Sequence, residues 1–264
     1  MNPLTLAVSK VIIENRGSAT GFFYKRGDDI FFITNKHVVL NEGGYNNLTI
    51  YPNFIISNNN IYTGCSFTIP AERVSNISYH HSNDQVDIAA LWIIGANGFV
   101  QNITEATTNA DIRSICCIND MKQTDISAEV ADNAFIIGYP HGHSAETGIP
   151  HGSPKPIWKC GTIATEMSLN YDADNCGSFL IDATGQQGNS GSPVVAYAGV
   201  GNGMFKTANG GIVMKAGGGL IYKFLGVMSA ILISPKAQPQ EKSDLCLVWK
   251  VHLIDEILNA ASGI

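Results

Sequence analysis

The chain has 264 residues, of which 45% are hydrophobic and 14% are charged, and its formal net charge at pH 7 is -6. This length is sufficient for a substantial core in one large domain or in two lobes. The negative charge and the lack of a lysine- and arginine-rich cluster argue against nucleic acid and anionic membrane surfaces as partners. No apolar run in the sequence reaches membrane-spanning length.

The apolar runs are short and are bounded by Gly, Asn, Asp and Pro, which is typical of an all-β protein. In the first half, strands are predicted at 8–14, 30–34, 48–56, 65–69 and 88–94, and the segment 17–24 is predicted to be a small-residue turn that enters an aromatic strand. In the second half, they are predicted at 134–138, 155–166, 178–182, 194–197, 220–233 and 245–251. Helical spacing of apolar residues predicts a helix near the C-terminus, over 252–261.

The polar, aperiodic stretch 101–125 is expected to connect two lobes. We therefore place an N-terminal lobe at 1–120 and a C-terminal lobe, which carries the terminal helix, at 121–264. The first residues do not resemble a signal peptide, so a cytoplasmic location is expected. The six cysteines lack Cys-x-x-Cys spacing and are expected to be reduced thiols, mostly buried. They are Cys65, Cys116, Cys117, Cys160, Cys176 and Cys246.

The segment 188–193 reads Gly-Asn-Ser-Gly-Ser-Pro and leads into the strand at 194–197. Its glycines permit backbone angles that other residues avoid, so a tight turn with the Ser190 hydroxyl at its tip is expected. Such a serine is a candidate nucleophile if a base, a group that orients this base and oxyanion donors lie nearby. The alternative is an ordinary turn between strands. The G-x-S-x-G pattern of α/β-hydrolases is not met, because Ser192 occupies the last glycine position.

Two residues are candidates for the base and its orienting group. His37 directly follows the apolar strand at 30–34, where a rigid scaffold can aim its ring. Asp87 opens the apolar strand at 88–94, where a carboxylate requires a hydrogen-bonding partner such as a histidine N–H. The alternatives are a structural histidine and an aspartate that caps the strand through backbone amides. Asp84 is a rival carboxylate, but its polar loop favours a solvated side chain.

Two groups of side chains are candidate metal ligands, namely His80 and His81 with Asp84, and the loop histidines His141, His143 and His151. Adjacent histidines in a loop are more often solvated, and the second group is more typical of a surface loop near the site. We therefore expect neither a metal site nor an organic cofactor. A metal-dependent hydrolase that uses the second group remains an alternative hypothesis.

Three segments stand in the order His, Asp, Ser along the chain: 34–39 around His37, 87–91 after Asp87, and 188–193 around Ser190. Their order and contexts resemble those of the chymotrypsin-like (trypsin-fold) serine proteases. The similarity in style is greatest to single-domain bacterial trypsin-like peptidases and to the protease domain of HtrA-type enzymes. The Ile-Gly-Tyr-Pro run at 137–140 is in the same style, and the resemblance covers 17–233.

This resemblance implies two six-stranded antiparallel β-barrels with the site between them, and a C-terminal helix packed on the body. It implies a serine endopeptidase that hydrolyses peptide or protein substrates through a Ser-His-Asp triad and an acyl-enzyme intermediate. Ser190 would be the nucleophile, His37 the general base and Asp87 the group that orients this base. The backbone N–H groups of Gly188 and Ser190 would form the oxyanion hole.

The same resemblance implies a primary specificity pocket with Thr184 at its base. The remaining residues expected at the substrate site are Gln187, Ser229, Ala230 and Ile231. Thr184 is neutral, so the carboxylate that selects Arg or Lys is missing. Ile231 stands where a glycine is often found, which narrows the pocket. Cleavage is therefore expected after small or medium uncharged residues.

Some positions depart from the family pattern. Ser192 replaces a glycine, Asn189 replaces the aspartate that usually precedes the nucleophile, and the Gly-rich segment 199–219 is an insertion. Neutral Asn189 could not pair with a buried N-terminal ammonium, so no proteolytic activation is expected. The segment 188–193, here called the oxyanion loop, would instead be held by hydrogen bonds from the Asn189 amide, or be ordered by a partner or substrate. A catalytically silent binding module on the same fold is the alternative function, although the complete triad argues against it.

Overall fold

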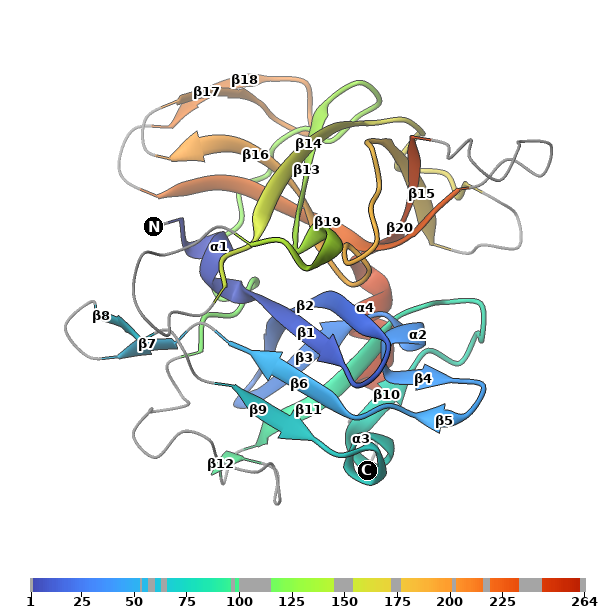
Figure 1. The fold of residues 1–264 in the computed structure, drawn as a ribbon. Coiled ribbons are helices and arrows are strands. Elements are labelled where there is room, and N and C mark those ends of the chain that lie inside the picture. The colour runs from blue at the N-terminus through green and yellow to red at the C-terminus, as the bar shows by residue number, and fades with distance from the viewer. Residues whose placement is uncertain are drawn as a thin grey trace.

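The computed structural model describes residues 2–52, 54–56, 60–62, 66–95, 98–99, 115–144, 154–171, 177–200, 203–215, 219–232 and 244–261. Its main strands fall into two groups, one from each half of the sequence, which lie one above the other in Figure 1. The all-β class and the C-terminal helix that the sequence predicts are confirmed.

Eight strands of the first half form one antiparallel sheet in the order β10-β11-β3-β2-β1-β6-β9, with β12 beside β11. They are β1 (Val8–Ile13), β2 (Gly17–Arg26), β3 (Asp29–Thr34), β6 (Leu48–Tyr51), β9 (Phe67–Ile69), β10 (Ser78–His80), β11 (Ala89–Gly95) and β12 (Gly98–Phe99). Gly27, with φ +59°, makes the tight turn from β2 into β3, as expected for a glycine in a short hairpin. Two small hairpins accompany the sheet, β4 (Leu40–Asn41) with β5 (Gly44–Tyr45) and β7 (Phe54–Ile56) with β8 (Asn60–Tyr62).

This sheet is a half-barrel, whereas the resemblance implied a closed ring of six strands. Its two end strands, β9 and β10, are joined along the chain by the helix α3 (Ala71–Ile77), and the described residues show no pairing between them. The helix α3 was not predicted from the sequence. Only Val74 and Ile77 are buried in this helix, and two apolar positions are too few to produce a helical period.

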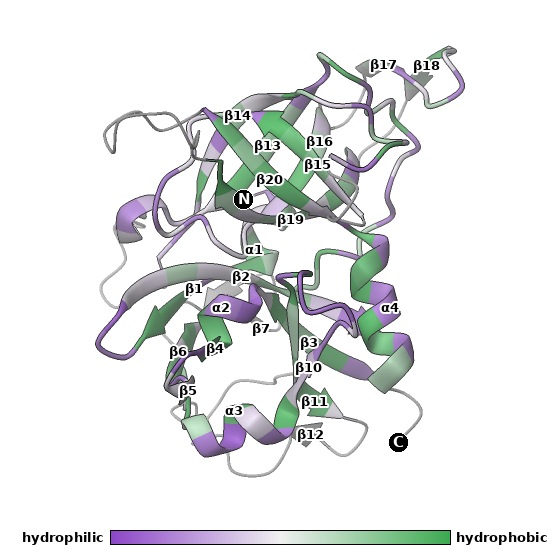
Figure 2. Cartoon of the chain, turned by 90° about the vertical axis from the view of Figure 1, so that its right-hand side faces the viewer, coloured by the Kyte–Doolittle hydropathy of each residue, from purple (hydrophilic) through white to green (hydrophobic). Residues whose placement is uncertain are grey.

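The strands of the second half form a closed barrel in the order β13-β14-β15-β20-β19-β16. They are β13 (Asn133–Gly138), β14 (Ile157–Ile163), β15 (Ser178–Asp182), β16 (Pro193–Val200), β19 (Leu220–Ile231) and β20 (Leu245–Lys250). Each overlaps a strand predicted from the sequence, and in Figure 2 β13, β14, β15 and β20 are mainly hydrophobic. A separate hairpin, β17 (Gly203–Lys206) with β18 (Ile212–Lys215), lies in the Gly-rich insertion.

The described part of the expected connection runs from one sheet to the other. The Ile118 N–H donates to the Phe23 carbonyl of β2 at 2.9 Å, and the Thr124 N–H donates to the Tyr222 carbonyl of β19 at 2.8 Å. The chain therefore passes from the first lobe to the second between these two residues. The part of the stretch before residue 115 lies outside the described residues.

A shared apolar core joins the two lobes. The rings of Phe22 on β2 and Phe224 on β19 lie edge to face, with their centroids 5.3 Å apart. The helix α4 (His252–Ala261) packs its predicted apolar face into the same cluster through Leu253, Ile254, Ile257 and Leu258. The short helix α1 (Pro3–Ala7), which the sequence analysis did not predict, contributes Leu4 and Ala7. Buried apolar contact of this extent holds the two lobes together.

The four described cysteines are free thiols: Cys117 and Cys246 are buried, Cys116 is half-buried and Cys160 is exposed. Cys117 and Cys246 agree with the expectation of mostly buried thiols, and Cys160, on β14, is an exposed exception. Cys65 and Cys176 lie outside the described residues. No helix in the described ranges combines the length and apolar character needed to cross a membrane.

Candidate active site

His37 lies on the one-turn helix α2 (Lys36–Val39), which follows β3. Val38 and Val39 are fully buried, whereas 52% of the His37 side chain is exposed. The turn is therefore anchored by its two valines and presents the ring at the surface. Asn35 precedes the helix and is itself fully buried.

Asp87 lies between two buried residues, Val86 and Ile88, so its side chain turns away from the core. Its Oδ1 accepts a hydrogen bond from the His37 backbone N–H at 2.9 Å, and its Oδ2 lies 2.7 Å from the Nδ1 of the His37 ring. The Ser229 hydroxyl also donates to Oδ2, at 2.5 Å. These contacts supply the partners that a carboxylate beside a buried strand requires.

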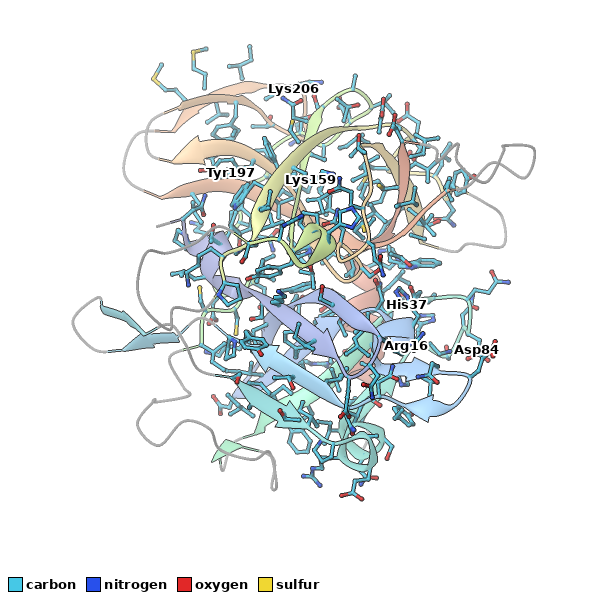
Figure 3. All side chains as sticks on the ribbon, viewed as in Figure 1. Arg16, His37, Asp84, Lys159, Tyr197 and Lys206 are labelled. Carbon is cyan, nitrogen blue, oxygen red and sulfur yellow. The ribbon has the colours of Figure 1, made fainter. Side chains whose placement is uncertain are left out.

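The rival carboxylate, Asp84, is at the surface. Its side chain is 97% exposed and pairs with Lys36 at 2.9 Å, and the hydrogen bond from Lys36 lowers the pKa of Asp84. Figure 3 shows Asp84 at the outer edge of the molecule. The neighbouring His81 is also engaged elsewhere, because its Nε2 lies 2.9 Å from Glu256 of α4. The structure therefore brings Asp87 to His37 and leaves Asp84 in an exposed ion pair.

Ser190 lies in a tight loop directly before β16, as the sequence predicts. The flanking Gly188 and Gly191 have φ values of +96° and +81°. A Cβ at Gly188 would lie 2.3 Å from the Tyr139 carbonyl oxygen, and one at Gly191 would lie 2.1 Å from the Thr20 carbonyl oxygen. Both positions therefore require glycine, for the backbone angle and for the space.

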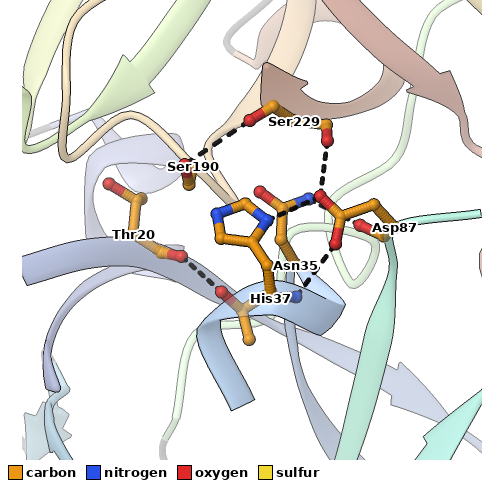
Figure 4. A network of polar contacts seen from close by, with 7 residues as sticks. Thr20, Asn35, His37, Asp87, Ser190 and Ser229 are labelled. Carbon is orange, nitrogen blue, oxygen red and sulfur yellow. Dashed lines mark hydrogen bonds and ion pairs between the residues drawn. The ribbon is translucent and has the colours of Figure 1, made fainter. Parts of the chain in front are cut away.

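The three triad candidates come together at the junction of the lobes. Figure 4 shows the His37 ring between Asp87 and Ser190. The Ser190 hydroxyl donates a long hydrogen bond, 3.4 Å, to the Ser229 carbonyl. The register of β19 against β20 shifts at Ser229, and such a bulge re-aims side chains. It lets Ser229 contact both Asp87 and Ser190.

Two backbone N–H groups of the loop are available to an anion. The Gln187 carbonyl accepts a hydrogen bond from the His141 N–H at 2.5 Å, and the carbonyl that precedes Ser190 accepts one from the Ser192 N–H at 2.9 Å. A trans peptide places its C=O and N–H on opposite sides. The N–H groups of Gly188 and Ser190 therefore point the other way, and within the described residues neither has an acceptor.

The turn that contacts Gln187 is strained. It is the short helix η2 (Pro140–Gly142), in which His141 has φ +51° and ψ +25°. A residue with a side chain adopts this left-handed region infrequently. Through its backbone N–H, strained His141 holds the Gln187 carbonyl, which directly precedes Gly188. The strain therefore lies at a residue that orients the candidate site.

The residues expected at the substrate site differ in their exposure to solvent. Ser229 is buried, Ile231 is half-buried, and the others, Thr184, Gln187 and Ala230, are exposed. The Ile231 side chain packs over Gly185, where a Cβ would lie 2.3 Å from its Cγ1. The wall of the expected pocket is therefore filled by a branched side chain.

Two residues near this pocket were missed by the sequence analysis. Cys246 pairs with Ile231 across β19 and β20 and is fully buried, and a Cβ on Gly185 would lie 2.8 Å from its Sγ. Burial raises the pKa of Cys246 to about 11, so its thiol is protonated at neutral pH. Lys159 of β14, labelled in Figure 3, donates through Nζ to the Thr184 carbonyl. Only the pairing of distant strands reveals these neighbours, which carry no motif.

The hydrogen bonds expected from the Asn189 amide are not formed in the described part of the chain. Asn189 is fully buried, yet neither its Nδ2 nor its Oδ1 has a partner there, and the same is true of the Ser192 hydroxyl. That expectation is therefore wrong. Contacts from other segments hold the loop instead, including the bond from the His141 N–H to Gln187.

The histidines considered as metal ligands are placed only in part. The rings of His141 and His143 lie 6.3 Å apart, and His151 lies outside the described residues. Among the residues that the structure describes, no three His, Cys, Asp or Glu side chains form a group that could hold a metal ion.

The trypsin-like peptidase domain family model matches residues 19–204, which is more than half of the chain. No curated protein matches the sequence. Solved structures with similarity include the Rv3671c protease from M. tuberculosis in its active form, at 17% identity over 98% of this chain and 83% of that one, with a TM-score of 0.49. The HtrA-type protease AlgW with a tripeptide has 15% identity over 97% of this chain and 60% of that one, with a TM-score of 0.49.

The protease Anisep from Arthrobacter nicotinovorans has 16% identity over 98% of this chain and 97% of that one, with a TM-score of 0.48. The family match includes His37, Asp87 and Ser190 and extends across both lobes. The chain therefore belongs to the trypsin-like peptidase family and is a serine protease.

Proposed function

We propose that this serine protease is an endopeptidase whose catalytic triad consists of Ser190, His37 and Asp87. The observation that carries the proposal is the 2.7 Å contact between the His37 Nδ1 and the Asp87 carboxylate. With its Nδ1–H donated to the carboxylate, the ring keeps a lone pair on Nε2, which is the tautomer that a general base requires. The position of the ring beside Ser190 in Figure 4 supports this role.

In the first step, the Ser190 Oγ attacks the carbonyl carbon of the scissile peptide bond, and His37 accepts the hydroxyl proton. The N–H groups of Gly188 and Ser190 stabilise the negative charge on the substrate oxygen. His37 then gives the proton to the leaving amine, the C–N bond breaks and an acyl-enzyme ester remains. His37 then takes a proton from water, the water oxygen attacks the ester carbonyl, the bond to the Ser190 Oγ breaks, and His37 returns the proton to Ser190. Asp87 holds the ring in place and stabilises the imidazolium.

Labelling with a fluorophosphonate probe tests this function directly. The probe forms a covalent bond only with an activated serine hydroxyl, so the purified protein should be labelled at Ser190, and peptide mapping by mass spectrometry should locate the adduct. A catalytically silent binding module on this fold would give no adduct. Labelling that survives EDTA would separate the proposal from a metal-dependent hydrolase that uses the loop histidines.

Cleavage is expected after small or medium uncharged residues such as Ala, Val or Leu. Thr184 provides no carboxylate for Arg or Lys, and Ile231, packed over Gly185, narrows the pocket. Profiling with a peptide library measures this preference. Ile231→Gly should extend it toward larger apolar residues, whereas Ile212→Gly, on the exposed face of β18, should leave the profile unchanged. A profile dominated by Arg or Lys would contradict the assignment.

Activity is expected without cleavage at the N-terminus. Burial of an ammonium beside neutral Asn189 would leave a charge unpaired, which is costly. The first described residues are also held elsewhere, because the Asn2 side chain donates to the Tyr197 hydroxyl at 3.2 Å and Thr5 accepts from the Trp158 indole N–H at 3.0 Å.

Active-site titration of protein expressed from Met1, with the intact N-terminus verified by mass spectrometry, measures this expectation. Asn189→Asp should give no activity that depends on a newly cut N-terminus. Activity that appears only after trimming would show that an activation step exists.

A further inference from the structure

We infer that Thr20, on β2 of the first lobe, is the positioning residue that holds the oxyanion loop of the second lobe in its working geometry. This inference rests on the proposed function, because it concerns the N–H groups of Gly188 and Ser190. Thr20 touches neither the reacting atoms nor the substrate in this scheme. It acts through the backbone of the loop.

Thr20 holds this loop on both sides of Asn189. Its hydroxyl donates to the Gly188 carbonyl at 2.7 Å, and its backbone N–H donates to the Ser190 carbonyl at 2.9 Å. Thr20 therefore binds the carbonyls of Gly188 and Ser190, the two residues whose N–H groups are the proposed oxyanion donors. Figure 4 shows Thr20 beside Ser190, on a strand of the opposite lobe.

The direction of the Thr20 hydroxyl is itself determined. Its Oγ1 accepts a hydrogen bond from the Tyr139 N–H at 3.0 Å, which leaves the hydroxyl hydrogen for the Gly188 carbonyl. Thr20 is fully buried, and its carbonyl accepts a hydrogen bond from the Thr34 hydroxyl at 2.8 Å. A β-branched residue in a strand also has a restricted χ1. The Thr20 hydroxyl therefore donates in one direction, toward the Gly188 carbonyl, and no solvent competes for this hydrogen bond.

Thr20 is in close contact with the loop and with the end of β13. A Cβ on Gly191 would lie 2.1 Å from the Thr20 carbonyl oxygen, and one on Gly138 would lie 2.9 Å from its Oγ1. The loop backbone therefore lies directly on Thr20. The Asn189 side chain, which has no partner in the described residues, supplies no alternative hydrogen bond to the loop.

Loss of the Thr20 hydroxyl would leave the Gly188 carbonyl and the Tyr139 N–H buried without this partner. The loop would then be free to move by a fraction of an ångström toward another acceptor or donor. Oxyanion donors act most strongly on the charge that develops in the transition state. A displaced donor therefore lowers kcat more than it raises KM. Misplacement by about 1 Å can cost about 100-fold in rate.

The test compares Thr20→Val, which keeps the shape and removes the hydroxyl, with Thr20→Ser, which retains the hydroxyl. Thr5→Val is the matched control, because it removes a buried threonine hydroxyl that accepts from the Trp158 indole N–H and, within the described residues, makes no hydrogen bond to Thr20 or to the oxyanion loop. Each variant is assayed for kcat and KM with the best peptide from the library profile, for inhibition by a peptide aldehyde of the same sequence, and for thermal unfolding.

Thr20→Val should lower kcat by about 10- to 100-fold with KM nearly unchanged. The aldehyde, whose hemiacetal oxygen occupies the oxyanion hole, should lose affinity in parallel with kcat/KM. Thr20→Ser should retain kcat within about threefold, a small barrier change on the rate scale. Thr5→Val should lower the unfolding temperature without this kcat and aldehyde pattern. If Thr20→Val does not fold, Thr20→Cys, whose thiol is a weak donor, takes its place with the same expectation.

Wild-type kcat and aldehyde affinity in folded Thr20→Val or Thr20→Cys would overturn the inference. An equal loss in Thr5→Val would do the same, because it would show a general effect of core damage. Ser190→Ala in the same assay distinguishes failure of the proposed function from failure of the inference about Thr20. If that variant keeps its activity, the proposed function fails and the inference fails with it; if only the Thr20 variants behave as wild type, the proposed function stands.

Discussion

Ser190→Ala is expected to abolish peptide cleavage and fluorophosphonate labelling while the fold remains intact. The substitution removes the only group in the proposed mechanism that forms a bond to the substrate, and members of such a triad act as a unit, so kcat should fall on the order of a million-fold. Among the described residues, the hydroxyl makes one long hydrogen bond, to the Ser229 carbonyl. Its loss should therefore change the unfolding temperature little.

His37→Ala should reduce kcat nearly as much as Ser190→Ala, because the serine loses its base. His81→Ala is the matched control: His81 lies on the same lobe and contacts Glu256 of α4, so this variant should keep wild-type kcat. The measurement is single-turnover and steady-state cleavage of one peptide by all three variants. Wild-type cleavage by Ser190→Ala would refute the nucleophile assignment.

Asp87→Asn is expected to lower kcat by about 10⁴-fold with little effect on the fold, the loss that follows when the histidine of such a triad takes the wrong tautomer. The carboxylate accepts from the Ser229 hydroxyl and faces the His37 Nδ1. A carboxamide can place its NH₂ group against Nδ1, and the ring then carries its proton on Nε2. In that tautomer the ring cannot accept the proton of Ser190.

Asp84→Asn provides the matched control for this charge removal. Asp84 lies three residues before Asp87 and is the exposed partner of Lys36. It should leave kcat unchanged. The informative measurement is kcat over a range of pH, together with the rate of fluorophosphonate labelling. Equal losses in the two aspartate variants would point to general electrostatics and would contradict a specific role for Asp87.

The strand pattern was the part of the fold that the sequence predicts best, because each barrel strand of the second half is a short apolar run with a clear end. The spacing of Leu253, Ile254, Ile257 and Leu258 likewise gave the terminal helix. The helices α1 and α3 carry too few apolar positions for a period to emerge. The open half-barrel form of the first sheet was also not predicted, because β9 and β10 are joined by the helix α3, whose formation depends on packing.

The residues of the candidate site likewise fall into two groups: those with a local sequence motif, and those whose contacts are with distant segments. The segments around His37, Asp87 and Ser190 have local signatures, and the structure places them at one junction, where their roles remain predictions. Thr20 and Cys246 have none, because their importance lies in which distant backbone they touch. The expected hydrogen bonds of the Asn189 amide also depend on non-local contacts. The sequence shows that an amide is present, but only the packed loop shows that this amide has no partner among the described residues.

The hydrogen bond between Thr20 and Gly188 spans 168 positions of the chain. During synthesis, the segment that carries the general base emerges first, and the nucleophile loop follows roughly 10 to 30 s later at ordinary elongation rates. In the proposed scheme, a nascent chain would have no working oxyanion loop until the second barrel packs against the first lobe. A fragment that ends within the second barrel should be unable to digest neighbouring proteins, so the order of the polypeptide delays the hydrolytic activity until the molecule is whole.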